Sequence, residues 1–179
     1  MAARIGQKAP YWEAQAFVPG QDKFAPVNVK STDYDGKWLV LFFYPLDFTF
    51  VCPTEIKSYS ESYDKFRELG AEVLGASTDS VFSHKAWSDK GDLGQLKFPL
   101  LADGNQELSR KFGVLVEEKG IALRGTFIID PEGKLRYSCV HDLGIGRSVD
   151  ETVRVLQALQ TGELCPVGWK PGAKTLGKA

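Results

Sequence analysis

The sequence predicts a layered α/β fold in a single domain, from two patterns and the chain length. Short apolar runs alternate with segments of helical spacing through the middle of the chain, and a hairpin followed by a helix closes it. The 179 residues suffice for one domain with a proper core and are too few for two ordinary ones. We therefore expect one domain over residues 1–179, of which 163–179 form a glycine- and proline-containing C-terminal tail.

The N-terminal third predicts loops, then a strand and a long helix. Residues 1–37 carry prolines, glycines and the turn pair Asp35-Gly36. Residues 38–44 read Trp-Leu-Val-Leu-Phe-Phe-Tyr, which is typical of a strand buried on both faces. Apolar residues recur every three or four positions over residues 53–69, which predicts a helix. Pro53 suits the first position of that helix, which places Cys52 at its N-cap.

The later elements follow from the same patterns. The segment Pro131-Glu132-Gly133 separates two apolar runs and indicates a hairpin. Gly162 follows the last periodic segment and indicates its end. Strands are expected over residues 72–77, 98–102, 123–130 and 135–140, and helices over 80–90, 105–113 and 149–160.

Composition and charge exclude several function classes. The chain has 22 basic and 23 acidic residues, so it lacks the positive excess that nucleic-acid binding requires. Its longest strongly apolar run, residues 38–44, is far too short to span a membrane. The N-terminus has no apolar signal-peptide segment, so we expect a cytoplasmic protein.

The cysteines and histidines are few and scattered. The chain has three cysteines and two histidines, with none of the clustering that a zinc or iron–sulfur site needs. The cytoplasm keeps structural disulfides rare, and an odd cysteine count there favours reactive or buried thiols. We expect no metal, haem or flavin.

Cys52 is the candidate nucleophile. Unpaired backbone N–H groups at a helix start carry partial positive charge, which stabilises a thiolate. Thr49 lies one turn before the cysteine and can donate a hydrogen bond to the sulfur, and Pro45 offers an apolar wall. The alternative is a buried cysteine that acts as a small hydrophobe. A Cys-x-x-Cys pair is excluded, because Thr49 and Glu55 occupy the two partner positions.

These residues also carry a family resemblance. The pattern Pro45-x-x-x-Thr49-x-x-Cys52 matches the active-site motif of the peroxiredoxins. The surrounding residues 42–55, together with 125–130 and 146–148, extend the match. The chain resembles the 2-Cys peroxiredoxins, the group that includes the alkyl hydroperoxide reductase C component. The resemblance implies a thioredoxin-like fold, with a central mixed sheet flanked by helices, N-terminal additions and a C-terminal tail.

The resemblance implies a role for each matching residue. Cys52 matches the peroxidatic cysteine, Thr49 the hydroxyl that orients peroxide, and Pro45 the residue that shields the sulfur from water. Arg124 matches the arginine that supports the thiolate and polarises the peroxide. Cys165 matches the resolving cysteine, which attacks the sulfenate of a neighbouring subunit. Three further residues match supporting positions of the site: Glu55, Trp87 and Arg147.

The implied activity is a thiol-dependent peroxidase for hydrogen peroxide and alkyl hydroperoxides. Thioredoxin or a flavoprotein disulfide reductase would reduce the resulting Cys52–Cys165 disulfide, and the family precedent is a dimer assembled into a ring, typically a decamer. A redox-regulated chaperone or a peroxide-signalling relay remains an alternative, as does a general disulfide oxidoreductase. Four other polar residues are expected to be bystanders: Asp47 as a solvated loop carboxylate, His84 as a solvated helix residue, and His141 and Cys139 as structural residues.

Overall fold

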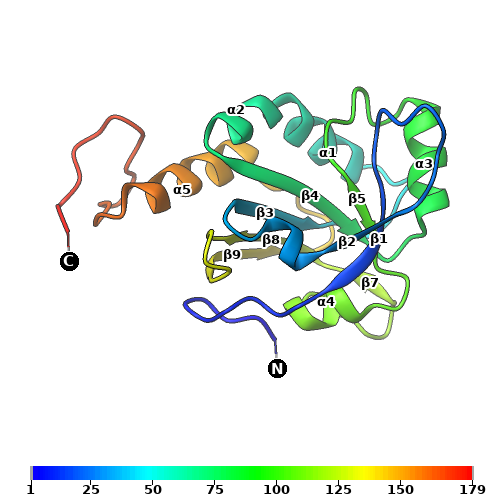
Figure 1. Cartoon of the computed structure of the whole chain (residues 1–179), viewed down its shortest axis with the longest axis horizontal. Coiled ribbons are helices and arrows are strands. Elements are labelled where there is room, and N and C mark those ends of the chain that lie inside the picture. Colours follow the sequence, from blue (N-terminus) through cyan, green and yellow to red (C-terminus); the bar gives the residue numbers. More distant parts are fainter. Residues whose placement is uncertain (1, 179) are drawn as a thin grey trace.

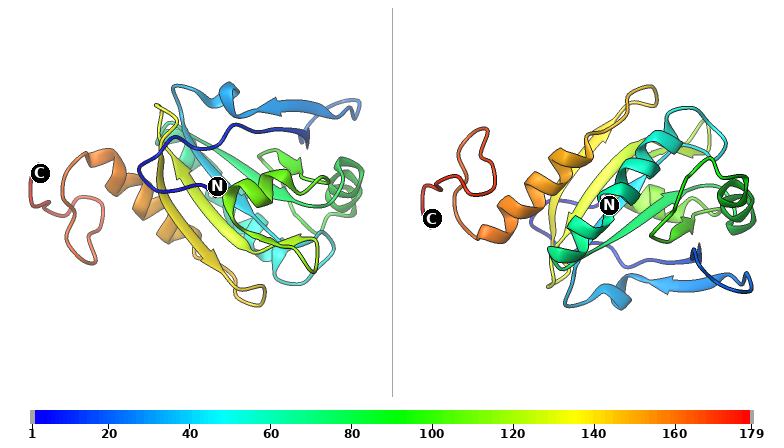
Figure 2. Two further views of the ribbon diagram at one scale, coloured as in Figure 1. Left: turned by 90° about the horizontal axis from the view of Figure 1, so that it is seen from below. Right: turned by 90° about the horizontal axis from the view of Figure 1, so that it is seen from above.

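The computed structural model describes residues 2–178 and shows a seven-stranded mixed sheet with helices on both faces (Figures 1 and 2). The strand order is β2-β1-β5-β4-β3-β8-β9, and β6 and β7 form a separate small hairpin. The strands are β1 Glu13–Phe17, β2 Val27–Lys30, β3 Trp38–Phe43, β4 Ala71–Ser77, β5 Leu100–Ala102, β6 Leu115–Val116, β7 Ile121–Ala122, β8 Arg124–Ile129 and β9 Leu135–His141. The central mixed sheet of the predicted fold class is confirmed.

The apolar strand β3 lies at the centre of the sheet. It pairs in parallel with β4 and antiparallel with β8. All its residues but Trp38 are buried, because helices cover both faces of this part of the sheet. The predicted hairpin is confirmed as the antiparallel pair β8–β9.

The helices form two unequal layers around the sheet. They are α1 Cys52–Glu61, α2 Tyr63–Glu68, α3 Val81–Lys90, α4 Glu107–Phe112 and α5 Val149–Thr161, with a short 3₁₀ helix over Ser31–Tyr34. One core cluster joins α1, α2, α3 and α5 to one face of the sheet, and the other joins α4 to the opposite face. The predicted helix over 53–69 is interrupted at Ser62, whose backbone leaves the helical region (φ −90°, ψ 0°).

Four strands were not predicted from the sequence: β1, β2 and the two strands of the short β6–β7 hairpin. Residues 1–37 were expected to be loops, but they contain β1 and β2. Strand β1 reads Glu-Ala-Gln-Ala-Phe, and alanine, glutamine and glutamate are weak strand formers. Its conformation is decided by long-range pairing, because β1 bonds to β2 on one side and to β5 on the other.

The C-terminal tail is more ordered than its composition suggests. The backbone N–H of Leu164 donates to the carbonyl of Gly177, and the carbonyl of Leu164 accepts from the N–H of Leu176, each at 2.8 Å. Trp169 is buried, and its carbonyl accepts a 2.9 Å bond from Arg154 of α5. The tail forms a closed loop that extends beyond the end of α5, away from the sheet (Figures 1 and 2). No helix within residues 2–178 is long and apolar enough to cross a membrane.

Candidate active site

Cys52 lies in the first turn of α1, directly after the loop that leaves β3. It is the first helical residue and not the N-cap, which is Val51. The prediction of a cysteine N-cap was wrong by one residue, because Val51 already has helical backbone angles and its carbonyl accepts bonds from Thr54 and Glu55. The Cys52 side chain is fully buried and still lies among the unpaired N–H groups of the helix start.

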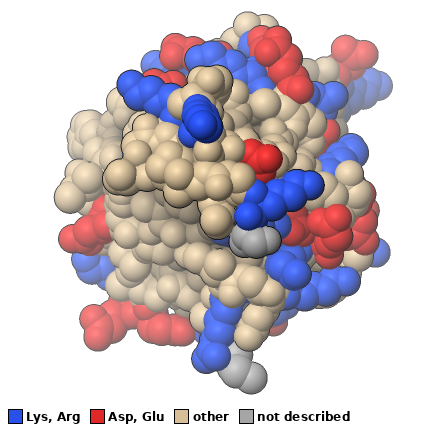
Figure 3. Space-filling model, turned by 90° about the vertical axis from the view of Figure 1, so that its left-hand side faces the viewer, with Lys and Arg blue, Asp and Glu red and all other residues tan. Residues whose placement is uncertain are grey.

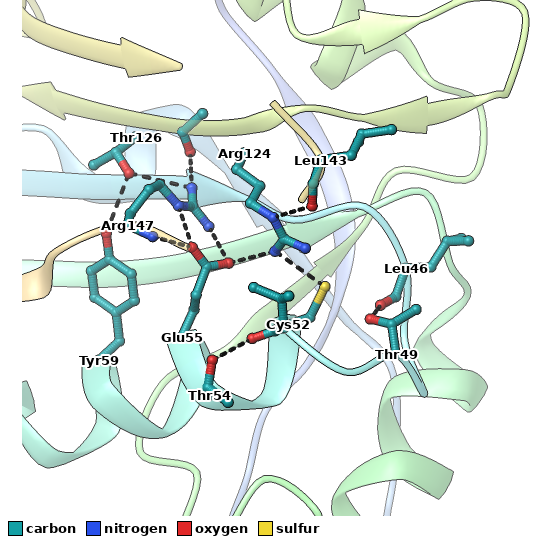
Figure 4. Close-up of polar contacts among 12 residues, drawn as sticks. Leu46, Thr49, Cys52, Thr54, Glu55, Tyr59, Arg124, Thr126, Leu143 and Arg147 are labelled. Atoms are coloured by element: carbon teal, nitrogen blue, oxygen red, sulfur yellow. Dashed lines mark hydrogen bonds and ion pairs between the residues drawn. The ribbon is translucent and has the colours of Figure 1, made fainter. Parts of the chain in front are cut away.

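Arg124 contacts the sulfur directly. As the first residue of β8, it extends its guanidinium to Cys52, and Nη1 lies 3.4 Å from Sγ (Figure 4). The same Nη1 donates to Glu55 Oε2 at 2.6 Å, and Nε donates to the carbonyl of Leu143 at 2.7 Å. Two acceptors therefore fix the orientation of the cation, and its charge stabilises a thiolate at Cys52.

Glu55 links this arginine to a second one. Arg147 donates to Glu55 through its backbone N–H and Nε at 2.8 Å each, and through Nη2 at 3.0 Å. Burial acts to raise the pKa of Glu55, but the hydrogen bonds and charge of Arg147, followed by the charge of Arg124, outweigh it and lower that pKa. The carboxylate is thus ionised between two buried guanidinium groups.

Two residues missed from the sequence complete this network. Thr126 of β8 bonds through its hydroxyl to Arg147 Nη1 and to the Tyr59 hydroxyl, each at 3.3 Å. Arg147 Nη1 also donates to the carbonyl of Gly125 at 2.6 Å. Only the packing of distant segments brings these groups together, since they come from α1, from β8 and from the loop before α5 (Figure 4).

The loop before Cys52 differs from its prediction in one respect. Pro45 is buried, as a shielding residue requires. The Thr49 hydroxyl donates to the carbonyl of Leu46 at 2.9 Å and, within residues 2–178, makes no bond to the Cys52 sulfur. The expectation that it donates to the sulfur is therefore wrong in this structure, because the loop folds the hydroxyl back onto its own backbone.

The comparisons with known proteins decide the family. The model of the AhpC/TSA family matches residues 5–138. The chloroplastic 2-Cys peroxiredoxin BAS1 of Hordeum vulgare is 52% identical, over 96% of this chain and 84% of the relative. The crystal structure of the reduced 2-Cys peroxiredoxin of Plasmodium vivax superposes with a TM-score of 0.89 at 37% identity, over 96% and 91% of the two chains. AhpC of Enterococcus faecalis gives 0.85 at 42% identity, over 93% and 100%.

The chain belongs to the AhpC/TSA family of peroxiredoxins. This membership confirms the predicted thioredoxin-like fold and the thiol-dependent peroxidase function, with a peroxide as substrate and a thiol as reductant. The comparisons do not favour the chaperone or signalling alternative. Within residues 2–178, no group of three or more His, Cys, Asp or Glu side chains is placed to hold a metal ion.

In this peroxiredoxin the second thiol lies outside the Cys52 site. Cys165 is half-buried in the tail, and its sulfur lies 3.6 Å from Thr161 Oγ1 and 3.8 Å from the carbonyl of Ala158. All three cysteines are free. Cys139 lies on β9, opposite Thr126 of β8 in the register of the hairpin.

Two bystander predictions are wrong. Asp47 and His84 were expected in solvent, but both are buried and lie 2.8 Å apart. Trp87 is fully buried beside them, with its ring 6.1 Å from that of Tyr44 and 5.8 Å from that of Phe48. The loop and α3 pack together here, and this contact is not visible in the local sequence pattern.

Proposed function

We propose that Cys52 is the residue that reduces the peroxide. Its thiolate attacks one peroxide oxygen, an S–O bond forms and the O–O bond breaks. The leaving oxygen takes up a proton and departs as water or an alcohol, and the cysteine becomes a sulfenic acid. The observation that supports this assignment is the 3.4 Å contact between Arg124 Nη1 and the buried sulfur.

Arg124 can stabilise negative charge both on the attacking sulfur and on the leaving oxygen. Its Nη1 serves the sulfur, and its other terminal nitrogen, Nη2, bonds to no residue within 2–178. Nη2 is therefore available for the oxygen on which negative charge develops. Glu55 and Arg147 hold this arginine in place, Pro45 excludes water from the sulfur, and Thr49 supplies a hydroxyl for the peroxide once it turns from Leu46.

Cys165 of another subunit is proposed to resolve the sulfenic acid. Its thiolate attacks the Cys52 sulfur, an intersubunit disulfide forms, and water leaves. The tail supports this role, because it extends away from its own sheet and carries exposed apolar residues: Leu164, Val167 and Leu176. Figure 3 shows a broad uncharged area at this end of the molecule, bordered by charged side chains. Such a surface suits contact with a second chain.

A dithiol donor then reduces the disulfide and closes the cycle. We propose thioredoxin or a flavoprotein disulfide reductase as donor, the cytoplasm as the site of action, and dimers assembled into a decameric ring. A coupled peroxide-consumption assay with each donor tests the function. Sustained turnover with at least one donor is expected, and consumption that stops near one equivalent of peroxide per subunit with both donors would refute it.

A further inference from the structure

A buried polar cluster lies beneath the loop that precedes Cys52. Asp47 Oδ1 accepts a 2.9 Å bond from the Tyr44 hydroxyl, and Asp47 Oδ2 lies 2.8 Å from His84 Nδ1. His84 is wholly buried on α3, and its Nε2 lies 3.1 Å from the carbonyl of Leu101 on β5. Burial, and then the charge of Asp47, raise the pKa of Tyr44 well above its ordinary value, so the phenol remains a donor.

His84 has a polar partner at each ring nitrogen. A carbonyl oxygen only accepts, so His84 Nε2 must donate to Leu101. His84 Nδ1 faces Asp47 Oδ2 at 2.8 Å and the Tyr44 hydroxyl at 3.4 Å. Asp47 and His84 therefore form a fully buried hydrogen-bonded pair.

The polar groups that surround the Asp47–His84 pair come from three elements. The loop contributes Asp47 and Tyr44, and the turn after β4 contributes Asp79, which accepts a 2.9 Å bond from the backbone N–H of Asp47. Strand β5 contributes the Leu101 carbonyl. Asp47, Asp79 and His84 thus meet at this point, and no other basic side chain within residues 2–178 bonds to either carboxyl group.

The loop needs such an anchor because its backbone is strained. Phe48 follows Asp47 and has a φ of +56°, a left-handed conformation that a bulky residue seldom adopts. Asp47 is held through its side chain and its backbone N–H, and these contacts fix the chain on one side of the strained residue. Pro45 and Thr49 lie two residues to either side of Asp47, so its position sets theirs.

We propose that His84 is a positioning residue for peroxide reduction, a buried imidazole ring that holds Asp47 and thereby the loop carrying Pro45 and Thr49. This inference rests on the roles proposed above for those two residues. It assigns His84 no contact with the peroxide or the sulfur. Its effect is on the orientation of the peroxide and not on the charge of the thiolate, and the two can be measured separately.

The buried contacts of His84 are tested first, in the reduced wild-type protein. The chain has two histidines, so ¹⁵N labelling of histidine gives two ring systems, and the His141→Gln variant identifies the signals of His84. The Nε2 proton of His84, which faces the Leu101 carbonyl, is expected to be observed and protected from exchange with solvent. An Nε2 of His84 without a proton would overturn the proposal.

The positioning role is tested in a Cys139→Ser/Cys165→Ser background, where Cys52 is the remaining thiol. His84→Leu removes both ring nitrogens, and we expect peroxide to oxidise Cys52 about tenfold more slowly or worse. His84→Gln keeps a hydrogen-bonding group and should recover part of that rate. Alkylation of Cys52 by iodoacetamide needs a thiolate but no oriented peroxide, so it should be unchanged in both variants.

The two rates together separate this proposal from the proposed function. A parallel loss of alkylation would show that His84 acts on the thiolate or the fold, and an unchanged peroxide rate would show that it does not act at all; either result overturns the positioning role. Failure of the proposed function gives a different result: peroxide would not oxidise Cys52 in the Cys139→Ser/Cys165→Ser protein that retains His84.

Discussion

The two thiols of the proposed cycle lie in opposite environments. Cys52 is fully buried in the first turn of α1, and its sulfur contacts an arginine that Glu55 and a backbone carbonyl hold in place. Cys165 lies past the end of α5 in a loop that extends from the body of the protein, and its closest polar contacts are the 3.6 Å and 3.8 Å contacts to Thr161 and Ala158.

The difference fits the roles proposed for the two thiols. The attack on peroxide needs a charged sulfur and aligned donors that are in place before the reaction, which requires a rigid, buried site. The proposed resolution needs a thiol that lies where another chain can approach it. Cys52 is accordingly the buried thiol with an arginine at its sulfur, and Cys165 is the half-buried thiol on the projecting tail.

Replacing the buried thiol has the largest expected effect. Cys52→Ser should abolish peroxidase turnover, because a serine hydroxyl at neutral pH is neither a thiolate nor a comparable nucleophile. The measurement is donor-coupled peroxide consumption. Cys139→Ser is the matched control and should retain nearly full turnover. Substantial activity in the first variant, or its loss in the second, would contradict the assignment of Cys52.

Replacing the half-buried thiol, Cys165, should leave the first step intact. The oxidised wild-type protein should run as a covalent dimer on a non-reducing gel, and Cys165→Ser should remove that dimer. The rate at which Cys52 first reacts with peroxide should stay the same, because Cys165 does not contact that site in its own chain. Peptide mapping that finds a Cys52–Cys165 bond within one chain would exclude the intersubunit pairing.

Removing the carboxylate that joins the two arginines tests the rigidity of the first site. Glu55→Gln leaves two buried guanidinium groups without their anion, and loss of one partner of a buried pair costs about 3 kcal/mol or more. Urea unfolding of the reduced protein at pH 7 measures this difference. Glu117→Gln, which breaks an exposed bidentate pair with Arg110, is the control and should change stability little.

The stability difference between wild type and Glu55→Gln should depend on pH in a defined direction. The folded-state pKa of Glu55 is lowered, by contacts to Arg147 and Arg124 that outweigh burial. Its contribution to stability is therefore fully present above its ordinary value of 4.5 and is lost as the pH falls through the lowered folded-state pKa. The stability gap between wild type and Glu55→Gln should narrow in acid, and a gap that widens there would contradict this account.

The smallest expected effect comes from a change that keeps the charge. Arg124→Lys retains a cation but loses the planar fork that bonds the sulfur, Glu55 and the Leu143 carbonyl together. We expect the second-order rate constant with peroxide to fall about tenfold, equivalent to roughly 1.4 kcal/mol of barrier. Stopped-flow oxidation of the reduced enzyme measures it. An unchanged rate constant would show that charge alone suffices.

Local patterns predicted most of the fold correctly. The apolar run of β3, the periodicity of α5 and the turn between β8 and β9 each give an element at nearly the expected place. They failed for β1, where alanines and polar residues form a strand because β2 and β5 lie on either side of it. They also missed the interruption at Ser62, which a continuous helical spacing does not reveal.

The same division holds at the site. Cys52 was identified from its position between a buried strand and a helix, and Arg124 from the family motif; the structure brings the two side chains into contact. The prediction for Asp47 and His84 was wrong. The two residues are 37 positions apart, and no local pattern shows that a loop carboxylate and a helical imidazole are buried together. A polar residue is expected at the surface unless a hydrogen-bonding partner for it is known.

The sequence by itself determined the chemistry of this protein: a thiol after a buried strand, an arginine at the start of another, and a motif specific to one family. These are properties of residue type and local spacing, and they can be recognised without knowing how the chain folds. Only the tertiary structure decided which polar groups meet. Arg124 and Cys52 are 72 positions apart and Arg147 and Glu55 are 92, and contacts at that separation depend on how the sheet and helices pack.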